Sequence, residues 1–87
     1  MLYVARTVFM PWGEERHSQV VDVVAGKVVS VIPFTEELPS MLFVEEIHIT
    51  SFDSPIVVDD IRIEAHHSGG PLYAYSADGS GVLTRLF

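Results

Sequence analysis

The sequence contains no cysteine, which excludes a disulfide framework and any metal site built on thiolates. Basic residues are scarce as well: five Lys and Arg stand against twelve Asp and Glu, so the net charge is −7. Such a chain has too few cations to neutralise phosphates, so we exclude nucleic acids and anionic membranes as partners. Long hydrophobic runs are also missing, because no apolar stretch approaches the roughly 20 residues that a membrane helix needs.

The remaining composition indicates one small globular domain spanning residues 1–87. Hydrophobic residues make up 48% of the chain, which is too many for a disordered protein. A chain of this size buries about two-thirds of its surface, enough for a single thin core. Arg6 interrupts the first apolar run and no small-residue cleavage pattern follows, so we expect no signal peptide and a soluble, cytoplasmic protein.

The residue types that are abundant favour strands. Thirteen Val, six Ile and four Thr give a strong β bias, and no long segment has helical periodicity. Gly and Pro divide the chain about every ten residues, which is typical of short strands joined by turns. We therefore predict an all-β fold, a small antiparallel sandwich or a barrel-like sheet. Its seven strands are expected at 2–10, 18–24, 27–34, 41–50, 56–65, 72–76 and 82–86.

The sharpest local signal is the hairpin over 18–34, which turns at Ala25-Gly26. We expect a type I turn closed by Gly26 in the left-handed region, with a bulge. Both strands of this hairpin are apolar on both faces. A chain with one core can cover only one of the two faces of the hairpin. The other face is then an interface, either in a homo-oligomer such as a dimer or with a larger protein, unless the strands at 2–10 and 82–86 or the C-terminal Leu86-Phe87 fold back over it. The predicted interface residues are Val21, Val23, Val29 and Val31.

A second hairpin, of 41–50 with 56–65, gathers imidazole and carboxylate groups on one polar face. It would place Glu46 near Arg62 and His48 near Asp60. Such groups are ligands for zinc, iron or nickel, and the alternative metal set is His48, Asp60, Glu64 and His66. No recognised ligand spacing is present, and the neighbouring His67 points to the opposite face from His66. We therefore predict a solvated face with cross-strand charge pairs and no bound metal.

No motif predicts a catalytic residue or a cofactor. The chain has no nucleophile signature, and its Gly-rich segments lack the helix and Lys that a phosphate-binding loop requires. The aromatic residues lack interleaved basic residues, so they do not predict stacking on nucleic acid. Trp12, Phe34 and Phe52 stand beside turns, where an exposed ring more often marks a protein interface.

Residues 4–34 resemble the opening of amidohydrolase-superfamily proteins. The resemblance lies in the hairpin pattern from Val21 to Pro33, with its Gly26 turn and closing proline. It implies the small β-sandwich domain that stands beside a metal-binding barrel in that superfamily. This chain lacks the H-x-H pair that would follow and is too short for a barrel, so no catalytic residue carries over. As a whole, the chain resembles small bacterial proteins that consist of such a β domain alone.

These observations favour a non-enzymatic β domain that acts by association, with itself or as an accessory module of a larger protein. Two alternatives stay open at this point. One is a small metal-dependent enzyme that uses the His48 face, and the other is a β-barrel that binds a small apolar ligand in its interior.

Overall fold

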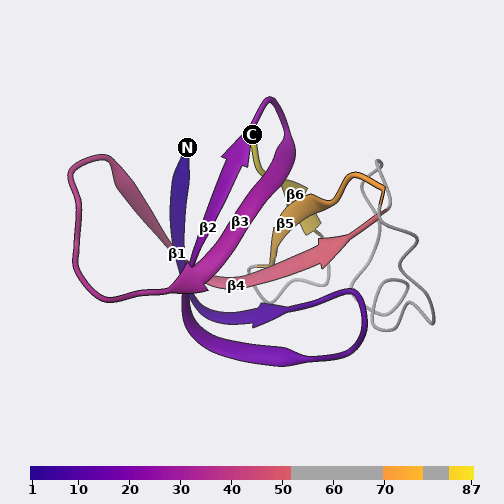
Figure 1. Ribbon diagram of the computed structural model, residues 1–87, viewed down its shortest axis with the longest axis horizontal. Helices are drawn as coiled ribbons and strands as arrows, with labels where there is room; N and C mark the ends of the chain where they lie inside the picture. The colour runs from indigo at the N-terminus through magenta and orange to yellow at the C-terminus, as the bar shows by residue number, and fades with distance from the viewer. Residues whose placement is uncertain (52–69, 78–82) are drawn as a thin grey trace.

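The computed structural model describes residues 1–51, 70–77 and 83–87, which form six strands in one sheet (Figure 1). The strands are β1 (Leu2–Phe9), β2 (Glu15–Val24), β3 (Lys27–Pro33), β4 (Met41–Thr50), β5 (Tyr73–Ala77) and β6 (Leu83–Arg85). Their order across the sheet is β3-β2-β1-β4-β5-β6. None of the residues in these ranges forms a helix, and so none forms a helix able to cross a membrane. The predicted all-β class is confirmed.

The finer prediction of an antiparallel sandwich or barrel is wrong, because the strands form one open sheet of mixed direction. β4 lies beside β1 and runs parallel to it, with Leu2 opposite Met41 and Phe9 opposite His48. The chain leaves β3 at one edge and crosses β2 and β1 through residues 34–40 before β4 begins. A crossover of this kind returns the chain to the same direction, which a tight hairpin cannot do.

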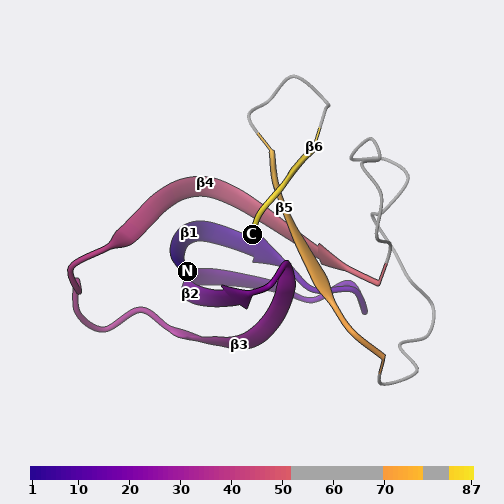
Figure 2. The same cartoon turned by 90° about the horizontal axis from the view of Figure 1, so that it is seen from above.

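The sheet curls strongly, so that β5 and β6 cross over the other strands (Figure 2), and its larger core lies within the curl. Its two distant parts meet where the Val28 amide donates a hydrogen bond of 2.8 Å to the Leu72 carbonyl, just before β5. Leu86 follows β6 and is buried against the same core. The core therefore forms inside the curl and not between two sheets. Its buried members are Tyr3, Ala5, Val8, Met10, Val21, Val23, Ile47, Ile49, Ala74 and Leu86.

The predicted strand positions agree with the described strands to within three residues. The largest difference is in β2, which begins at Glu15 and not at Ser18. The predicted strand 56–65 lies outside the described residues. Its predicted pairing with β4 is wrong over residues 46–48, where β5 occupies one edge of β4 and β1 the other. The cross-strand neighbours of His48 are accordingly Phe9 and Tyr75, and not Asp60.

The hairpin of β2 and β3 turns at Ala25-Gly26 as expected, with Gly26 at a φ of 77°. Ala25 also has a positive φ, of 54°, and Val24 pairs directly with Lys27. The connection is therefore a two-residue loop of the type I′ kind, not the expected type I turn with an adjacent bulge. The backbone twist of a type I′ turn matches the right-handed twist of the two strands that it joins. The bulge lies further along, where Val29 is the extra residue of β3.

Candidate functional site

The four valines of the predicted interface have different environments. Val21 and Val23 are fully buried in the core, where Leu86 covers the sheet. Val31 is half-buried and packs against the same core, and only Val29 is exposed, at 63%. The chain thus covers one face of its own hairpin, and a partner surface has to be sought on the other face.

The alternative metal set lies mostly outside the described residues, which hold only His48 of its four members. Asp60, Glu64 and His66 lie outside them, and the rest of the described chain holds no group of three possible ligands. His48 itself is 5% exposed, with its Nε2 3.0 Å from Oε1 of Glu46 and its ring stacked on Phe9 at 4.6 Å. These contacts anchor the imidazole within the sheet, as in a packed structural histidine.

The strand neighbour of His48 on the other side is Tyr75, which is completely buried. Burial, with a smaller contribution from Tyr73, raises the pKa of the Tyr75 hydroxyl above its ordinary value. The phenol therefore stays protonated at neutral pH. This part of the sheet provides packing and polar contacts, and no reacting group is evident among the described residues.

The opposite surface of β1 to β4, which we call the outer face, carries a row of four apolar residues. Strand pairing aligns Ile32 with Val20, Val20 with Val4, and Val4 with Phe43. The two central valines are each 6% exposed although they lie outside the main core. The residues at the two ends remain open to solvent, at 54% for Ile32 and 59% for Phe43.

The segment 34–40 packs beside this row through one residue, and residues 35–40 are exposed. Its first residue, Phe34, donates its amide to the Ser18 carbonyl at 2.8 Å, and its ring meets Phe43 edge-on at 6.2 Å. The aromatic pair lies beside Val4, with which it lines one surface depression. Of the three aromatic residues expected at an interface, Phe34 lies here, Trp12 is 49% exposed at the β1–β2 turn, and Phe52 lies outside the described residues.

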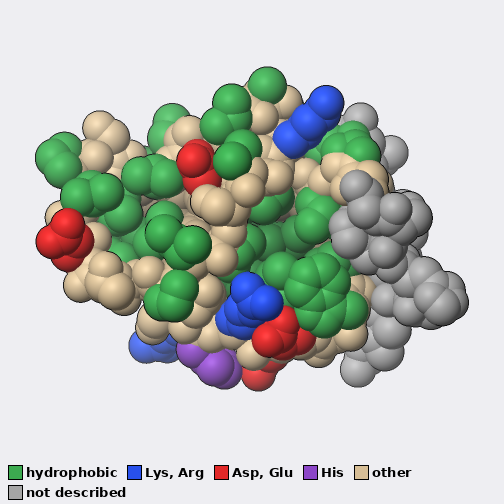
Figure 3. Space-filling model, in the orientation of Figure 1, with side chains coloured by type: hydrophobic (Ala, Val, Ile, Leu, Met, Phe, Trp, Pro, Cys, Tyr) green, Lys and Arg blue, Asp and Glu red, His purple; other side chains and the backbone are tan. Residues whose placement is uncertain are grey.

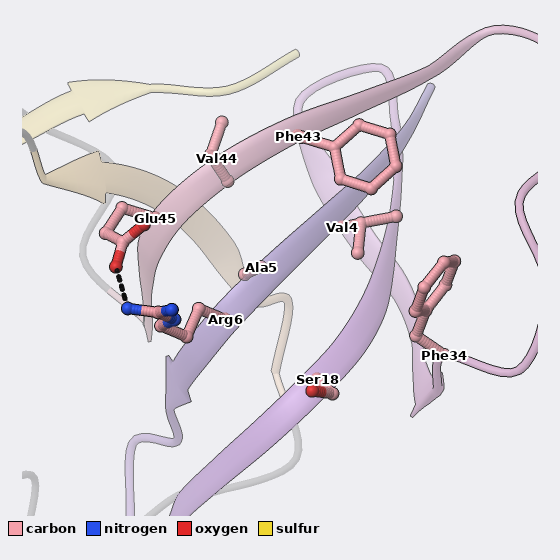
Figure 4. Close-up of a pocket in the computed structure, with 8 residues that line it drawn as sticks. All are labelled: Val4, Ala5, Arg6, Ser18, Phe34, Phe43, Val44 and Glu45. Carbon is pink, nitrogen blue, oxygen red and sulfur yellow. Dashed lines mark hydrogen bonds and ion pairs between the residues drawn. The ribbon is translucent and has the colours of Figure 1, made fainter.

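A hollow of about 370 Å³ opens beside the aromatic pair (Figure 4). Val4 and the two phenylalanines lie on one side of it, and the polar residues lie on the other. Arg6 and Glu45 form an ion pair there, with 3.1 Å between Nη1 and Oε1, and both side chains are largely exposed. The lining residues are Val4, Ala5, Arg6, Ser18, Phe34, Phe43, Val44 and Glu45.

A shared irregularity in three strands positions this hollow. Arg6 is omitted from the pairing of β1 with both neighbours, and Ser18 in β2 has a φ of 54°. Ala5 and Val8 both enter the core although they are three residues apart, so the alternation of β1 changes phase between them. The bend separates the apolar row from the ion pair and makes room for the hollow.

Sequence reasoning did not find the outer face, because it rests on the crossover and on the parallel pairing of β1 with β4. A compositional signal was available. Residues 28–35 and 38–44 carry no ionisable side chain in a chain with a net charge of −7. In the space-filling view, apolar side chains gather over β2, β3 and the connection to β4, with isolated charged groups among them (Figure 3).

Comparison of the chain with protein-family models, with curated proteins and with solved structures found no match.

Proposed function

We propose that this protein is a non-enzymatic association module that binds a protein surface through its outer face. The observation that carries the proposal is the exposure of Ile32 and Phe43 at the two ends of one apolar row. Large apolar side chains left open to solvent on one face of a small protein are a typical mark of an interaction site. The resemblance of residues 4–34 to an accessory β domain supports the same role.

The charge distribution supports docking at this face. The chain is strongly acidic, yet the segments that supply Ile32, Phe34 and Phe43 are free of ionisable groups. Interface centres are typically depleted of charge and enriched in aromatic residues, with a polar rim. Arg6 and Glu45 supply such a rim beside the hollow.

A second candidate is the binding of a small apolar ligand, and the hollow favours it. Because the described sheet is not closed into a barrel, the ligand would lie against Val4, Phe34 and Phe43 on the outer face. The volume of the hollow is within the range of small-molecule pockets. A bound small molecule in a native mass spectrum of the purified protein would favour this candidate over protein docking.

The association proposal is tested with a double variant, Ile32→Lys with Phe43→Lys, and with Trp12→Lys as a control. Trp12 is similarly exposed but lies on the β1–β2 turn. We expect affinity purification and native mass spectrometry to show a complex of fixed stoichiometry for the wild type and the control, and none for the double variant. A complex that the double variant keeps, or no complex at all, would contradict the proposal.

A further inference from the structure

We infer that the partner of the outer face is a second copy of this chain, related by a two-fold axis that runs along the strands between β1 and β4. The inference rests on the proposed function and names its partner. In this arrangement Phe43 of each copy packs into the hollow of the other, and Arg6 of each copy faces the partner's Glu45.

The charges beside the hollow select a second copy. Arg6 and Glu45 lie on neighbouring strands, at adjacent positions of the parallel pair, and form one exposed cation and one exposed anion side by side. Rotation by 180° about an axis between the two strands exchanges their places. Each charge then faces its opposite in the other copy, so this pair is complementary to itself.

The apolar part of the outer face is also complementary to itself under this rotation. Val4 and Phe43 are strand neighbours across the same axis, with Val4 buried in the hollow and Phe43 projecting beside it. The rotation therefore places the exposed ring of each copy over the hollow of the other. Both rings become covered by one operation, which is the property of an isologous contact.

The alternative of pairing through the sheet edges is unfavourable. The Val28 amide of edge strand β3 already binds Leu72, and Pro33 at the end of the strand has no amide to donate. The opposite edge, β6, is only three residues long. A second copy therefore finds its contacts on the face, where Phe43 and the ion pair lie.

The experiment uses two charge variants, Arg6→Glu and Glu45→Arg, each of which places like charges across the two-fold axis. Sedimentation equilibrium measures the dimer dissociation constant of each variant alone and of their equimolar mixture. In a mixed dimer, the two negative side chains of the Arg6→Glu copy face the two positive side chains of the Glu45→Arg copy. The charges across the interface are then opposite again, although the two charges within each copy are alike. We expect the mixed dimer to be about tenfold tighter than the mean of the two homodimers, because four exposed charges change from repulsion to attraction.

The matched controls are Arg16→Glu and Glu14→Arg, which make the same charge changes in an ion pair of 3.0 Å at the β1–β2 turn. We expect their mixture to show no preference for the mixed dimer. Phe43→Lys should leave the protein monomeric. Circular dichroism verifies folding, and the exposed Arg6 and Glu45 keep the test valid if the Phe43 variant does not fold.

Failure of this inference can be distinguished from failure of the proposed function. A wild-type monomer at every concentration, or a dimer without preference in the mixture of Arg6→Glu and Glu45→Arg, would overturn the two-fold arrangement. The proposed function would still stand if a complex with a different protein were lost on Ile32→Lys with Phe43→Lys. If no complex of any kind depended on the outer face, both would fall.

Discussion

At the scale of single residues, Gly26 is the position where backbone geometry most restricts the sequence. Its φ of 77° is poorly tolerated by a β-branched side chain, and a Cβ added there would lie 3.0 Å from Nη2 of Arg85 and 3.2 Å from the ring of Phe87. We expect Gly26→Val to lower the free energy of unfolding by about 2 kcal/mol. Urea unfolding followed by circular dichroism measures the change.

Substitution of the neighbouring Ala25 is the control, because it should not lower the free energy of unfolding. Ala25 also has a positive φ, so Ala25→Gly relieves strain in the folded turn while adding freedom to the unfolded chain. We expect its stability to be unchanged or about 1 kcal/mol higher. A Gly26→Val protein as stable as the wild type would show that the turn adapts to a side chain.

Residue-level signals predicted the position of this turn and the positive φ of Gly26, but not its type, because Gly and Pro restrict the backbone only locally. Val-Ala-Gly-Lys located the hairpin, and Pro33 located the end of β3. The faces of the valines were not predictable in the same way. A bulge at Val29 shifts the alternation of β3 by one residue, and no local preference of a valine records that shift.

At the scale of elements, Phe34 anchors the connection 34–40 to the outer face, where its amide binds Ser18 and its ring meets Phe43. We expect Phe34→Ala to lower the free energy of unfolding by about 2 kcal/mol, less than for a fully buried Phe because the ring is half-exposed. Leu38→Ala in the same connection is the control, since Leu38 is 43% exposed and should change stability by less than about 0.5 kcal/mol. Equal effects of the two substitutions would contradict an anchoring role of Phe34.

The positions of the strands were predictable from composition and from the Gly and Pro residues between them, whereas the pairing of the strands was not. Apolar and polar residues alternate along β4 in a way that fits any neighbouring strand. The sequence therefore favoured pairing with the next predicted strand, 56–65. The structure instead inserts β4 between β1 and β5. Pairing of segments about forty residues apart depends on the burial of the whole sheet, which local patterns do not encode.

At the scale of the whole molecule, the net charge of −7 opposes the meeting of two copies. Salt screens this long-range repulsion more than it weakens the close contact of Arg6 with the partner's Glu45. We therefore expect the dimer dissociation constant to fall several-fold when NaCl rises from about 20 to about 300 mM, a range that shortens the screening length well below the size of the protein. A dissociation constant that rises with salt would show that local ion pairs dominate association.

The candidate site belongs to this largest scale, which explains why sequence analysis placed the interface on Val21 and Val23. A core forms from whichever face of a hairpin the rest of the chain covers. Here Leu86, more than fifty residues downstream, contributes to that cover. The sequence could indicate that one face of the hairpin was left over, but only the curl of the sheet shows that this face contains Ile32 and Phe43.

The central place of β1 also has a consequence for synthesis on the ribosome. Of the six described strands β1 is translated first, and its pairing with β2 can form as soon as residues 15–24 emerge. Its other edge has to wait for residues 41–50, because only β4 completes the parallel side. A nascent chain of intermediate length therefore presents one unpaired edge of β1 to its surroundings, and a holding chaperone that covers this edge would limit aggregation over that interval.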